Sequence, residues 1–225
     1  MTDLDNQTPY WDAVATTKRF THPLHAPWTA TIGRDAAILD YGCGYGQTMA
    51  DLAELGFTDL TGVDSSAGMI GTARTQHPTM RFELVDAPPT LPFPDASFDL
   101  TVLFAVLTCI PGDAAQRRLI DELSRILKPG GLLYISDLLL GDDPRSRERY
   151  ERFAATHGNG TNGVFAYGVF ETSDGAVCRH HPADHFATLL DSFEVQDSRR
   201  VGVATMNGNA AAGIQVLVRK SAAGY

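Results

Sequence analysis

Short apolar runs alternate with segments of helical spacing along the first two thirds of the chain. Five of these runs predict strands: 36–40, 60–64, 80–86, 98–107 and 132–140. Segments between them predict helices: 46–55, 66–75 and 113–127. The run FDLTVLFAVL is apolar on both faces, as a central parallel strand is. This β-α order predicts an α/β fold with a doubly wound, Rossmann-like parallel sheet.

The β-α order stops after residue 140. A polar stretch rich in charges, glycines and aromatic residues follows, and we interpret it as an insertion. A helix near 183–191 and two β-like runs joined by MNGNA predict a closing hairpin. We therefore expect one domain of 225 residues in four parts: an N-terminal helical lid (1–35), a cofactor-binding core (36–140), a substrate-side insertion (141–182), and a C-terminal helix and hairpin (183–225).

The net charge of −9 argues against a nucleic-acid partner, because binding to a phosphate backbone needs a basic face. Four arginines do cluster at 145, 147, 149 and 152, but acidic residues are interleaved with them. Such a pattern is typical of a solvated helix with mixed charges.

Cysteine use and hydropathy suggest where the protein resides. The three cysteines are odd in number and lack metal-ligand spacing, so we expect reduced thiols. The N-terminus shows no basic segment followed by an apolar one. The longest apolar run, 102–107, is too short to span a bilayer. We expect a soluble cytoplasmic protein without a membrane partner, and the sequence does not indicate its oligomeric state.

The stretch LDYGCGYGQT, residues 39–48, places a glycine turn after the first predicted strand and before a helix, as nucleotide sites do. The nicotinamide pattern G-x-G-x-x-G would need glycine at position 47, which is Gln47. Asp40, directly before the glycines, is unfavourable beside a pyrophosphate and suits a ligand with an ammonium group. These two residues disfavour a nicotinamide oxidoreductase.

Two further aspartates end predicted strands. Asp64 follows the second strand and can accept hydrogen bonds from both hydroxyls of a ribose. Asp86 follows the third strand, where it can meet the amine of an adenine. With Asp40, they describe a ligand that has an ammonium, a ribose and an adenine but no phosphate, which is S-adenosylmethionine. The alternative is that each aspartate merely caps the next helix.

The chain resembles the class I S-adenosylmethionine-dependent methyltransferases, in particular the type 11 group that is similar to quinone-biosynthesis enzymes. The resemblance covers about residues 36–140 and rests on five segments in family order: ILDYGCGYG, LTGVDSSAGMI, FELVDA, LPFPDASFDLTVLFAVL and LKPGGLLYISD. It implies a seven-stranded sheet of order 3-2-1-4-5-7-6 with strand 7 antiparallel. It also implies methyl transfer to a small molecule, in secondary metabolism, with S-adenosyl-L-homocysteine as the product.

The resemblance also implies roles for individual residues. Those implied for the methionine part of the cofactor are Asp40, Tyr41, Gly42, Gly44, Gly46 and, through its backbone, Phe104. Those implied for the adenosine part are Asp64, Ser65, Met69, Asp86 and Ala87. Many relatives carry a histidine pair late in the fourth strand, where this chain has Thr108 and Cys109, so no role of that pair is transferred.

Six of the seven histidines lie outside the β-α core, in the N-terminal segment and the insertion. His180 and His181, before Pro182, are candidates to bind or deprotonate the substrate, with surface or capping histidines as the alternative. His22 is a candidate to close over the cofactor carboxylate. The spacing of His181 and His185 suggests a metal only weakly, because no carboxylate cluster accompanies it, and we expect no metal.

Aromatic residues in the same two segments predict an apolar or aromatic acceptor. Five of them are candidate substrate contacts: Tyr10, Trp11, Phe165, Tyr167 and Phe170. The alternative is that they only anchor the lid and the insertion to the core. The nucleophile that accepts the methyl group stays open between oxygen, nitrogen and carbon. A protein that binds the cofactor structurally, or uses it for another reaction, is the alternative function.

Overall fold

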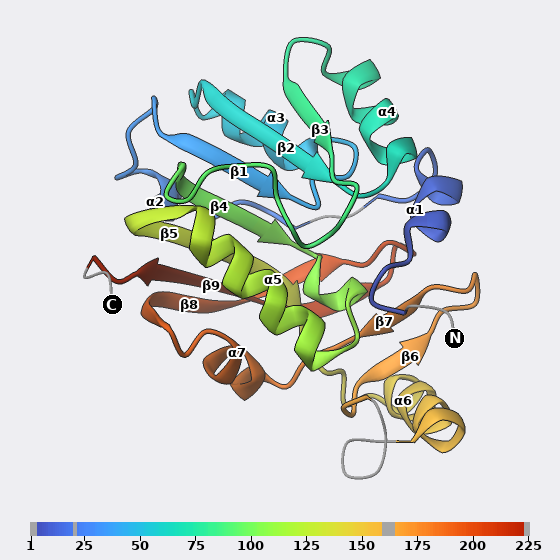
Figure 1. Ribbon diagram of the computed structural model, residues 1–225. Coiled ribbons are helices and arrows are strands. Elements are labelled where there is room, and N and C mark those ends of the chain that lie inside the picture. The colour runs from blue at the N-terminus through green and yellow to red at the C-terminus, as the bar shows by residue number, and fades with distance from the viewer. Residues whose placement is uncertain (1–3, 20–21, 159–164, 223–225) are drawn as a thin grey trace.

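A twisted sheet of seven strands forms the centre of the computed structural model, which describes residues 4–19, 22–158 and 165–222 (Figure 1). Its strand order is β3-β2-β1-β4-β5-β9-β8. The strands are β1 (Ala37–Tyr41), β2 (Asp59–Asp64), β3 (Arg81–Leu84), β4 (Phe98–Phe104), β5 (Leu127–Leu138), β8 (Phe193–Ala204) and β9 (Ala210–Lys220). Strands β1 to β5 are parallel, and β9 is antiparallel to both β5 and β8. This confirms the predicted order, with β9 as the antiparallel strand.

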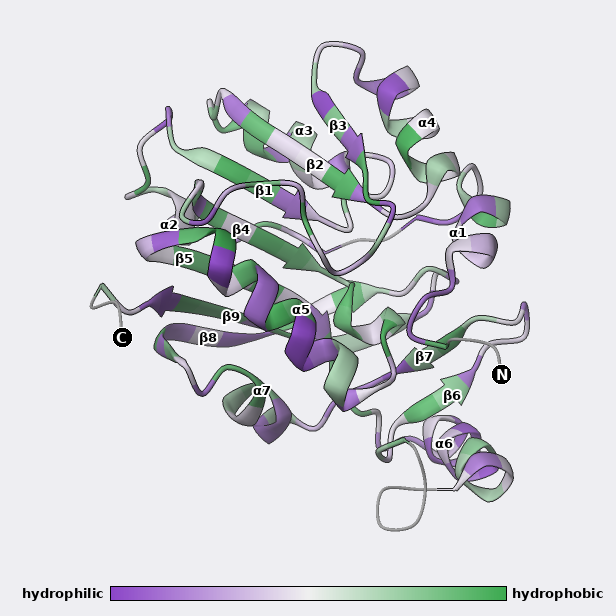
Figure 2. Cartoon of the chain, in the orientation of Figure 1, coloured by the Kyte–Doolittle hydropathy of each residue, from purple (hydrophilic) through white to green (hydrophobic). Residues whose placement is uncertain are grey.

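Helices cover both faces of the sheet. On one face, α5 (Asp113–Ile126) and α7 (Ala183–Leu189) pack their apolar sides on alternate residues of β1, β4 and β5 such as Leu39. On the other face lie α2 (Ala26–Thr29), α3 (Gln47–Glu54) and α4 (Ala67–Gln76), which meet residues such as Ile38. Because neighbouring strand residues point to opposite faces, runs apolar at every position are needed here. Figure 2 shows this green interior against the mixed colours of α5.

The insertion after β5 has regular structure of its own. It consists of α6 (Pro144–His157) and an antiparallel pair, β6 (Val169–Glu171) with β7 (Val177–Arg179). Asp143 caps α6 by accepting a hydrogen bond from the amide of Ser146 at 3.1 Å. A bridge between Leu139 and His181 joins the end of β7 to the end of β5. Residues 159–164 of the predicted insertion lie outside the described residues.

The N-terminal segment crosses the carboxyl ends of the parallel strands. Its helix α1 (Thr8–Val14) packs on α4, where Asp12 accepts hydrogen bonds from the hydroxyl of Ser66 and the amide of Gly68. Further along, the Asp5 carboxylate accepts one from the amide of Gly112, at 2.7 Å. The segment is thus fastened to loops that follow two different strands. Over the described residues, no helix has the length and apolar character that crossing a bilayer requires.

Candidate active site

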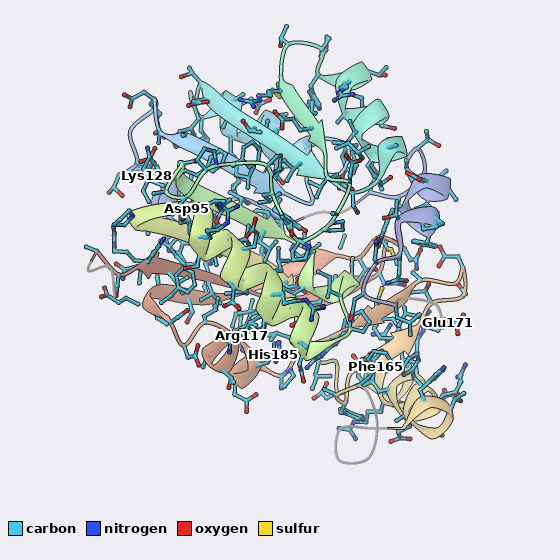
Figure 3. The ribbon with its side chains drawn as sticks, in the orientation of Figure 1. Asp95, Arg117, Lys128, Phe165, Glu171 and His185 are labelled. Carbon is cyan, nitrogen blue, oxygen red and sulfur yellow. The ribbon has the colours of Figure 1, made fainter. Side chains whose placement is uncertain are left out.

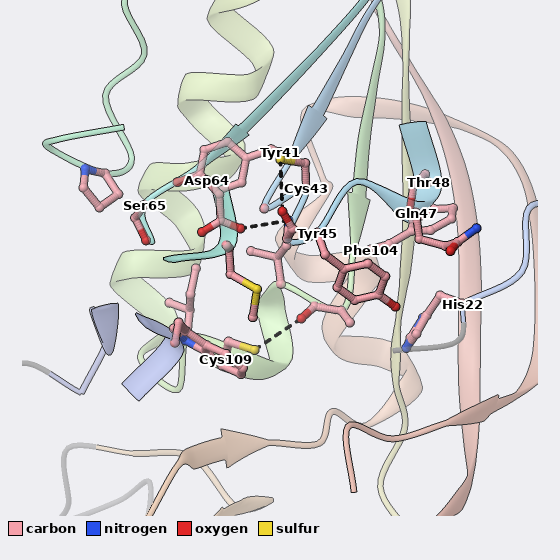
Figure 4. Close-up of a pocket in the computed structure, with 18 of the residues that line it drawn as sticks. His22, Tyr41, Cys43, Tyr45, Gln47, Thr48, Asp64, Ser65, Phe104 and Cys109 are labelled. Atoms are coloured by element: carbon pink, nitrogen blue, oxygen red, sulfur yellow. Dashed lines mark hydrogen bonds between the residues drawn. The ribbon is translucent and has the colours of Figure 1, made fainter. Parts of the chain in front are cut away.

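A cavity of about 490 Å³ opens at the carboxyl ends of β1, β2 and β4, beneath the N-terminal segment (Figure 4). The order of the sheet reverses between β1 and β4, so the loops that follow these strands diverge and leave a crevice. Predicted site residues on its wall are Trp11, His22, Tyr41, Gly42, Gly44, Asp64, Ser65, Met69 and Phe104. The fold therefore gathers nine side chains or backbone positions that are up to 93 residues apart in the sequence.

The glycine turn lies against β2 and β4. The amides of Gly42 and Cys43 both donate to the carbonyl of Val63, at 2.8 and 3.0 Å. Gly42 has φ +71°, and a Cβ there would lie 2.4 Å from a methyl of Val106. Only glycine meets both conditions, and its backbone is left facing the cavity.

Gly46 belongs to the same motif but lies off the cavity wall. A Cβ at this position would come within 2.8 Å of the Phe82 ring and 2.9 Å of the His77 ring. Its φ of +90° also needs glycine. Glycine is therefore needed here so that the start of α3 can pack on β3, and Gly46 does not shape the cavity wall.

Asp64 holds the turn and faces the cavity. Its carboxylate accepts hydrogen bonds from the amides of Gly44 and Ser66, at 3.0 and 2.8 Å. Burial raises the pKa of Asp64, and the hydrogen bonds that it accepts from backbone amides oppose that rise. Figure 4 shows Asp64 and Ser65 together at one end of the drawn site.

Asp40 lies just behind the turn and is 2% exposed. Its Oδ2 atom has no hydrogen-bond partner among the described residues. Burial, with repulsion from Asp64 and Asp51, raises the pKa of Asp40 to about 8. A buried carboxyl with an unmet oxygen can accept a donor from a ligand, and a cationic donor would restore its ionised form.

The other end of the cavity holds the basic groups. The Nδ1 atom of His22 lies 2.9 Å from the hydroxyl of Ser136, whereas its Nε2 atom is buried without a partner among the described residues. Burial lowers the pKa of His22 to about 4, so the ring is neutral at pH 7. Arg19 lies over the ring of Tyr45, with 4.5 Å to the centroid. Within the described part of the wall, it is the one arginine or lysine.

Comparison with known proteins identifies the family. A family model described as a methyltransferase domain, of type 11, matches residues 39–135. A solved SAM-dependent methyltransferase from Methanosarcina mazei is 26% identical, with a TM-score of 0.78, and the match covers 89% of this chain and 99% of that one. Residues 39–135 therefore form a methyltransferase domain, and nearly the whole chain is similar to a solved S-adenosylmethionine-dependent methyltransferase. The predicted family is confirmed, and S-adenosylmethionine is the family's cofactor.

Two curated methyltransferases are also similar. An O-methyltransferase of Aspergillus sclerotiorum is 30% identical over 143 residues, which is 61% of this chain and 52% of the relative. A demethylmenaquinone methyltransferase of Chlorobaculum parvum is 33% identical over 118 residues, which is 52% of this chain and 47% of the relative. The chain thus spans about half the length of these two relatives.

The cavity residues fit the cofactor of the methyltransferase family. Asp64 lines the wall and can meet a pair of ribose hydroxyls, whereas Asp40 lies off the wall, buried behind the glycine turn, where its charge favours an ammonium nearby. At the opposite end, Arg19 can meet a carboxylate, and the unmet Nε2 atom of His22 can donate to it in the corresponding tautomer. The unmet Nε2 atom of His22, on the cavity wall, is the observation that tests this fit most directly.

The adenine edge is only partly where it was predicted. Asp86 and Ala87 are exposed and lie off the cavity wall, whereas their neighbours Val85 and Pro88 line it. Strand β3 ends at Leu84, and after Val85 the chain leaves the cavity wall at Asp86 and Ala87 and returns to it at Pro88. The apolar neighbours are therefore the groups that this wall offers to an adenine ring.

His180 and His181 do not line the cavity. Both are buried, 3% and 0% exposed, because they leave β7 between the sheet and the insertion. The Nδ1 atom of His180 lies 2.8 Å from the hydroxyl of Tyr150 and 3.2 Å from Arg149. The Nε2 atom of His181 lies 2.9 Å from the side-chain nitrogen of Gln116. Neither ring can touch a ligand in the cavity in this arrangement.

The aromatic candidates divide in the same way. Trp11 lines the cavity, whereas Tyr10 donates to Asp174 at 3.0 Å and packs on the insertion. Phe165 lies beside α6 (Figure 3), where its ring centroid is 5.9 Å from that of Phe153. Tyr167 and Phe170 lie against the ring of Tyr150, at 5.4 and 5.8 Å. These last four contacts anchor the insertion, as the alternative interpretation had it.

Several wall residues were not singled out from the sequence. Among them are Asp5, Asn6, Gln7, Arg19, Tyr45, Gln47, Thr48, Val106, Cys109 and Ile110. Residues 106–110 follow β4 at the strand end where the crevice lies, and that position was a usable signal. The N-terminal residues carry no such signal, because their place depends on a crossing of the sheet that no local pattern specifies. No group of three or more histidine, cysteine or acidic side chains in the described residues is arranged to hold a metal.

Proposed function

We propose that this chain transfers a methyl group from S-adenosylmethionine to a small-molecule acceptor held in the 490 Å³ cavity. When bound, the cofactor supplies a methyl group activated by its sulfonium. The observation that carries the proposal is a division of the cavity wall: Asp64 lies at one end, and Arg19 with a neutral histidine lies at the other, with Asp51 also on the wall beside Gln47. This division complements a zwitterionic, phosphate-free adenosine.

We assign roles to the wall residues accordingly. Asp64 orients the ribose, and Arg19 with His22 holds the carboxylate, while Asp40, buried behind the wall, favours the ammonium by its charge. Binding at both ends fixes the reacting centre between them, which is the main task for an in-line displacement. With a pKa of about 4, His22 is a weak base, so we assign it to binding rather than to proton removal.

The acceptor side lies between the N-terminal segment and the short helix η1 (Leu107–Cys109). Trp11, Cys109 and Ile110 give this part of the wall an apolar and aromatic surface. It favours a flat apolar acceptor and excludes water once the acceptor is bound. The name of the Aspergillus sclerotiorum relative supports an oxygen nucleophile. Secondary metabolism as the setting stays a prediction of the resemblance.

The test combines binding with turnover. Calorimetry with S-adenosylhomocysteine and with NAD identifies the ligand, and stabilisation by NAD alone would refute the proposal. A labelled-methyl assay against phenols, quinols, carboxylic acids and amines then seeks the acceptor. Tight binding without transfer to any member of the panel would favour the alternative, in which the cofactor serves a structural or non-methylating role.

A further inference from the structure

The wall segment 106–110 is held from behind by a buried polar cluster that does not itself reach the cavity. Gln116, on α5, is 0% exposed. Its side-chain nitrogen lies 3.1 Å from the carbonyl oxygen of Leu107 and 2.6 Å from that of Ile110. Asp137, on β5, accepts a hydrogen bond from the amide of Thr108 at 3.2 Å. These contacts hold the backbone of the wall segment at Leu107, Thr108 and Ile110.

His181 lies between Gln116 and Asp137. Its Nε2 atom is 2.9 Å from the side-chain nitrogen of Gln116, and its Nδ1 atom is 3.8 Å from the Oδ1 atom of Asp137. The amide of Gln116 cannot be reversed, because two carbonyl oxygens face its nitrogen and His185 meets its oxygen at 2.7 Å. Since that nitrogen only donates, the Nε2 atom of His181 is an acceptor, which shares the two amide hydrogens with the two carbonyl oxygens. The ring proton is then on Nδ1, which faces Asp137 at 3.8 Å without a hydrogen bond among the described residues.

The cluster reaches the surface between α5 and α7, where Figure 3 shows His185 close to Arg117. The rings of His181 and His185 stack at 4.7 Å. Arg179, also on this side, donates to the carbonyl of Pro111 at 3.0 Å and to Asp113 at 2.6 Å. The residues that follow the wall segment are thus fixed from the same side.

We propose that His181 is a positioning residue, which orients the amide of Gln116 and so sets the place of Cys109 and Ile110 on the acceptor side of the cavity. The assignment rests on the proposed function only in calling that side the acceptor side. The backbone contacts themselves hold whatever reaction is catalysed. On the cavity side of this segment, the side-chain amide of Gln7 donates to the carbonyl of Cys109 at 3.1 Å.

The thiol of Cys109 reports the place of this wall without any acceptor. It lies 3.3 Å from the carbonyl of Ala105 and lines the cavity from η1. Cys43 lines the same cavity from the glycine turn but is only 7% exposed, and Cys178 is buried away from the cavity. The experiment measures the alkylation rate of each cysteine by iodoacetamide, with peptide mass spectrometry, in the full chain. Three variants are compared: His181→Gln, His181→Asn and His181→Phe. His180→Gln, the neighbouring buried histidine, is the matched control.

A glutamine places an oxygen near the Nε2 position and can still accept from Gln116, whereas asparagine is too short and phenylalanine cannot accept. We expect alkylation of Cys109 in the glutamine variant within about twofold of the wild type, and about tenfold faster in the other two, since one lost buried hydrogen bond can amount to that factor. His180→Gln should leave the alkylation rate of Cys109 unchanged.

Equal rates in the glutamine and asparagine variants would overturn the proposal, and that comparison stands even where His181→Phe fails to fold. Equal acceleration in the His180→Gln control would overturn it too, because the effect would then be general loosening. Calorimetry on the same variants should show an affinity for S-adenosylhomocysteine within about threefold of the wild type, because the hydrogen bond between His181 and Gln116 lies off the cavity and does not involve the cofactor. A failed methyl-transfer assay would refute the proposed function and leave the alkylation result unaffected.

Discussion

The glycine-turn side and the insertion side of this protein both bury acids and histidines, but they use them differently. On the glycine-turn side, Asp40 and His22 each keep an atom without a partner, and His22 faces the cavity. On the insertion side, His180 is held by Tyr150 and Arg149. The Nδ1 atom of His181 has no partner among the described residues, but both rings lie away from the cavity. A buried polar atom left unmet beside a cavity indicates a ligand, whereas one bonded to its neighbours indicates a structural role.

The largest expected effect tests the glycine-turn side. Asp64→Ala should weaken the binding of S-adenosylhomocysteine by at least about 100-fold, because charge-assisted hydrogen bonds to the ribose are lost. Calorimetry measures it. Asp59→Ala, an exposed aspartate at the opposite end of the same strand, is the control and should leave affinity unchanged. Unchanged affinity in Asp64→Ala would remove the ribose assignment.

The two sides also differ in how far the sequence could predict them. The turn motif and Asp64 were readable because each depends on local spacing: a run of apolar residues, then glycines or an acid at the strand end. The strand order was implied by the resemblance to the methyltransferases and not by spacing. On the insertion side, the sequence identified the aromatic residues and His180 as candidates from their residue type alone. Their role depends on α6 folding over β6 and β7, and no local pattern specifies that contact.

Arg19 shows the same limit within the site itself. It has no motif around it, and only the path of the N-terminal segment brings it over Tyr45. Likewise, the strand predicted at 132–140 begins earlier in the structure, where β5 runs from Leu127 through KPGG at 128–131. The register with β4 shifts between Phe98 and Leu100, which lets the irregular start of β5 pair. Contacts between distant segments decided both cases.

A second prediction separates the two ends of the cavity. Arg19→Ala should weaken the binding of S-adenosylhomocysteine by about tenfold, because its carboxylate loses a charged partner. The affinity for 5′-methylthioadenosine, which lacks both the carboxylate and the amine, should stay within about twofold. Calorimetry with both ligands checks this. An equal loss for the two ligands would place Arg19 at the adenosine end and contradict the assignment.

The buried histidines predict a pH dependence of stability. Burial lowers the pKa of His180 from 6.5 to about 3. Between these values the unfolded chain carries a proton that the folded chain does not, so stability rises with pH up to about 6.5 and is level above it. Asp137, whose pKa burial raises to about 7, acts in the opposite direction between 3.8 and 7.

Replacing His180 should therefore flatten the acid side of the profile. In His180→Gln, the rise of the unfolding free energy between pH 4 and 6.5 should lose up to about 1.4 kcal/mol per pH unit. Urea denaturation at a series of pH values measures the slope. His25→Gln serves as the control. An unchanged slope in His180→Gln would mean that the ring is solvated in the folded chain, against the contacts with Tyr150.

The smallest effect is expected on the outer face of α6, the part of the insertion that faces water. Glu148 and Arg152 form an i,i+4 ion pair at 2.8 Å in which both side chains are 71% exposed. Because both ends stay hydrated and must be ordered to meet, Arg152→Ala should change the unfolding free energy by no more than about 0.5 kcal/mol. On the inner face of the same helix, Phe153→Ala should lower the unfolding free energy by about 3 kcal/mol. Phe153 is 6% exposed and lies among the apolar residues of β6 and β7. Urea denaturation of the two variants measures the difference. Similar losses of unfolding free energy in Arg152→Ala and Phe153→Ala would show that α6 does not pack on β6 and β7. The insertion would then be arranged differently from this structure, and the contrast between the two sides of the molecule would fail.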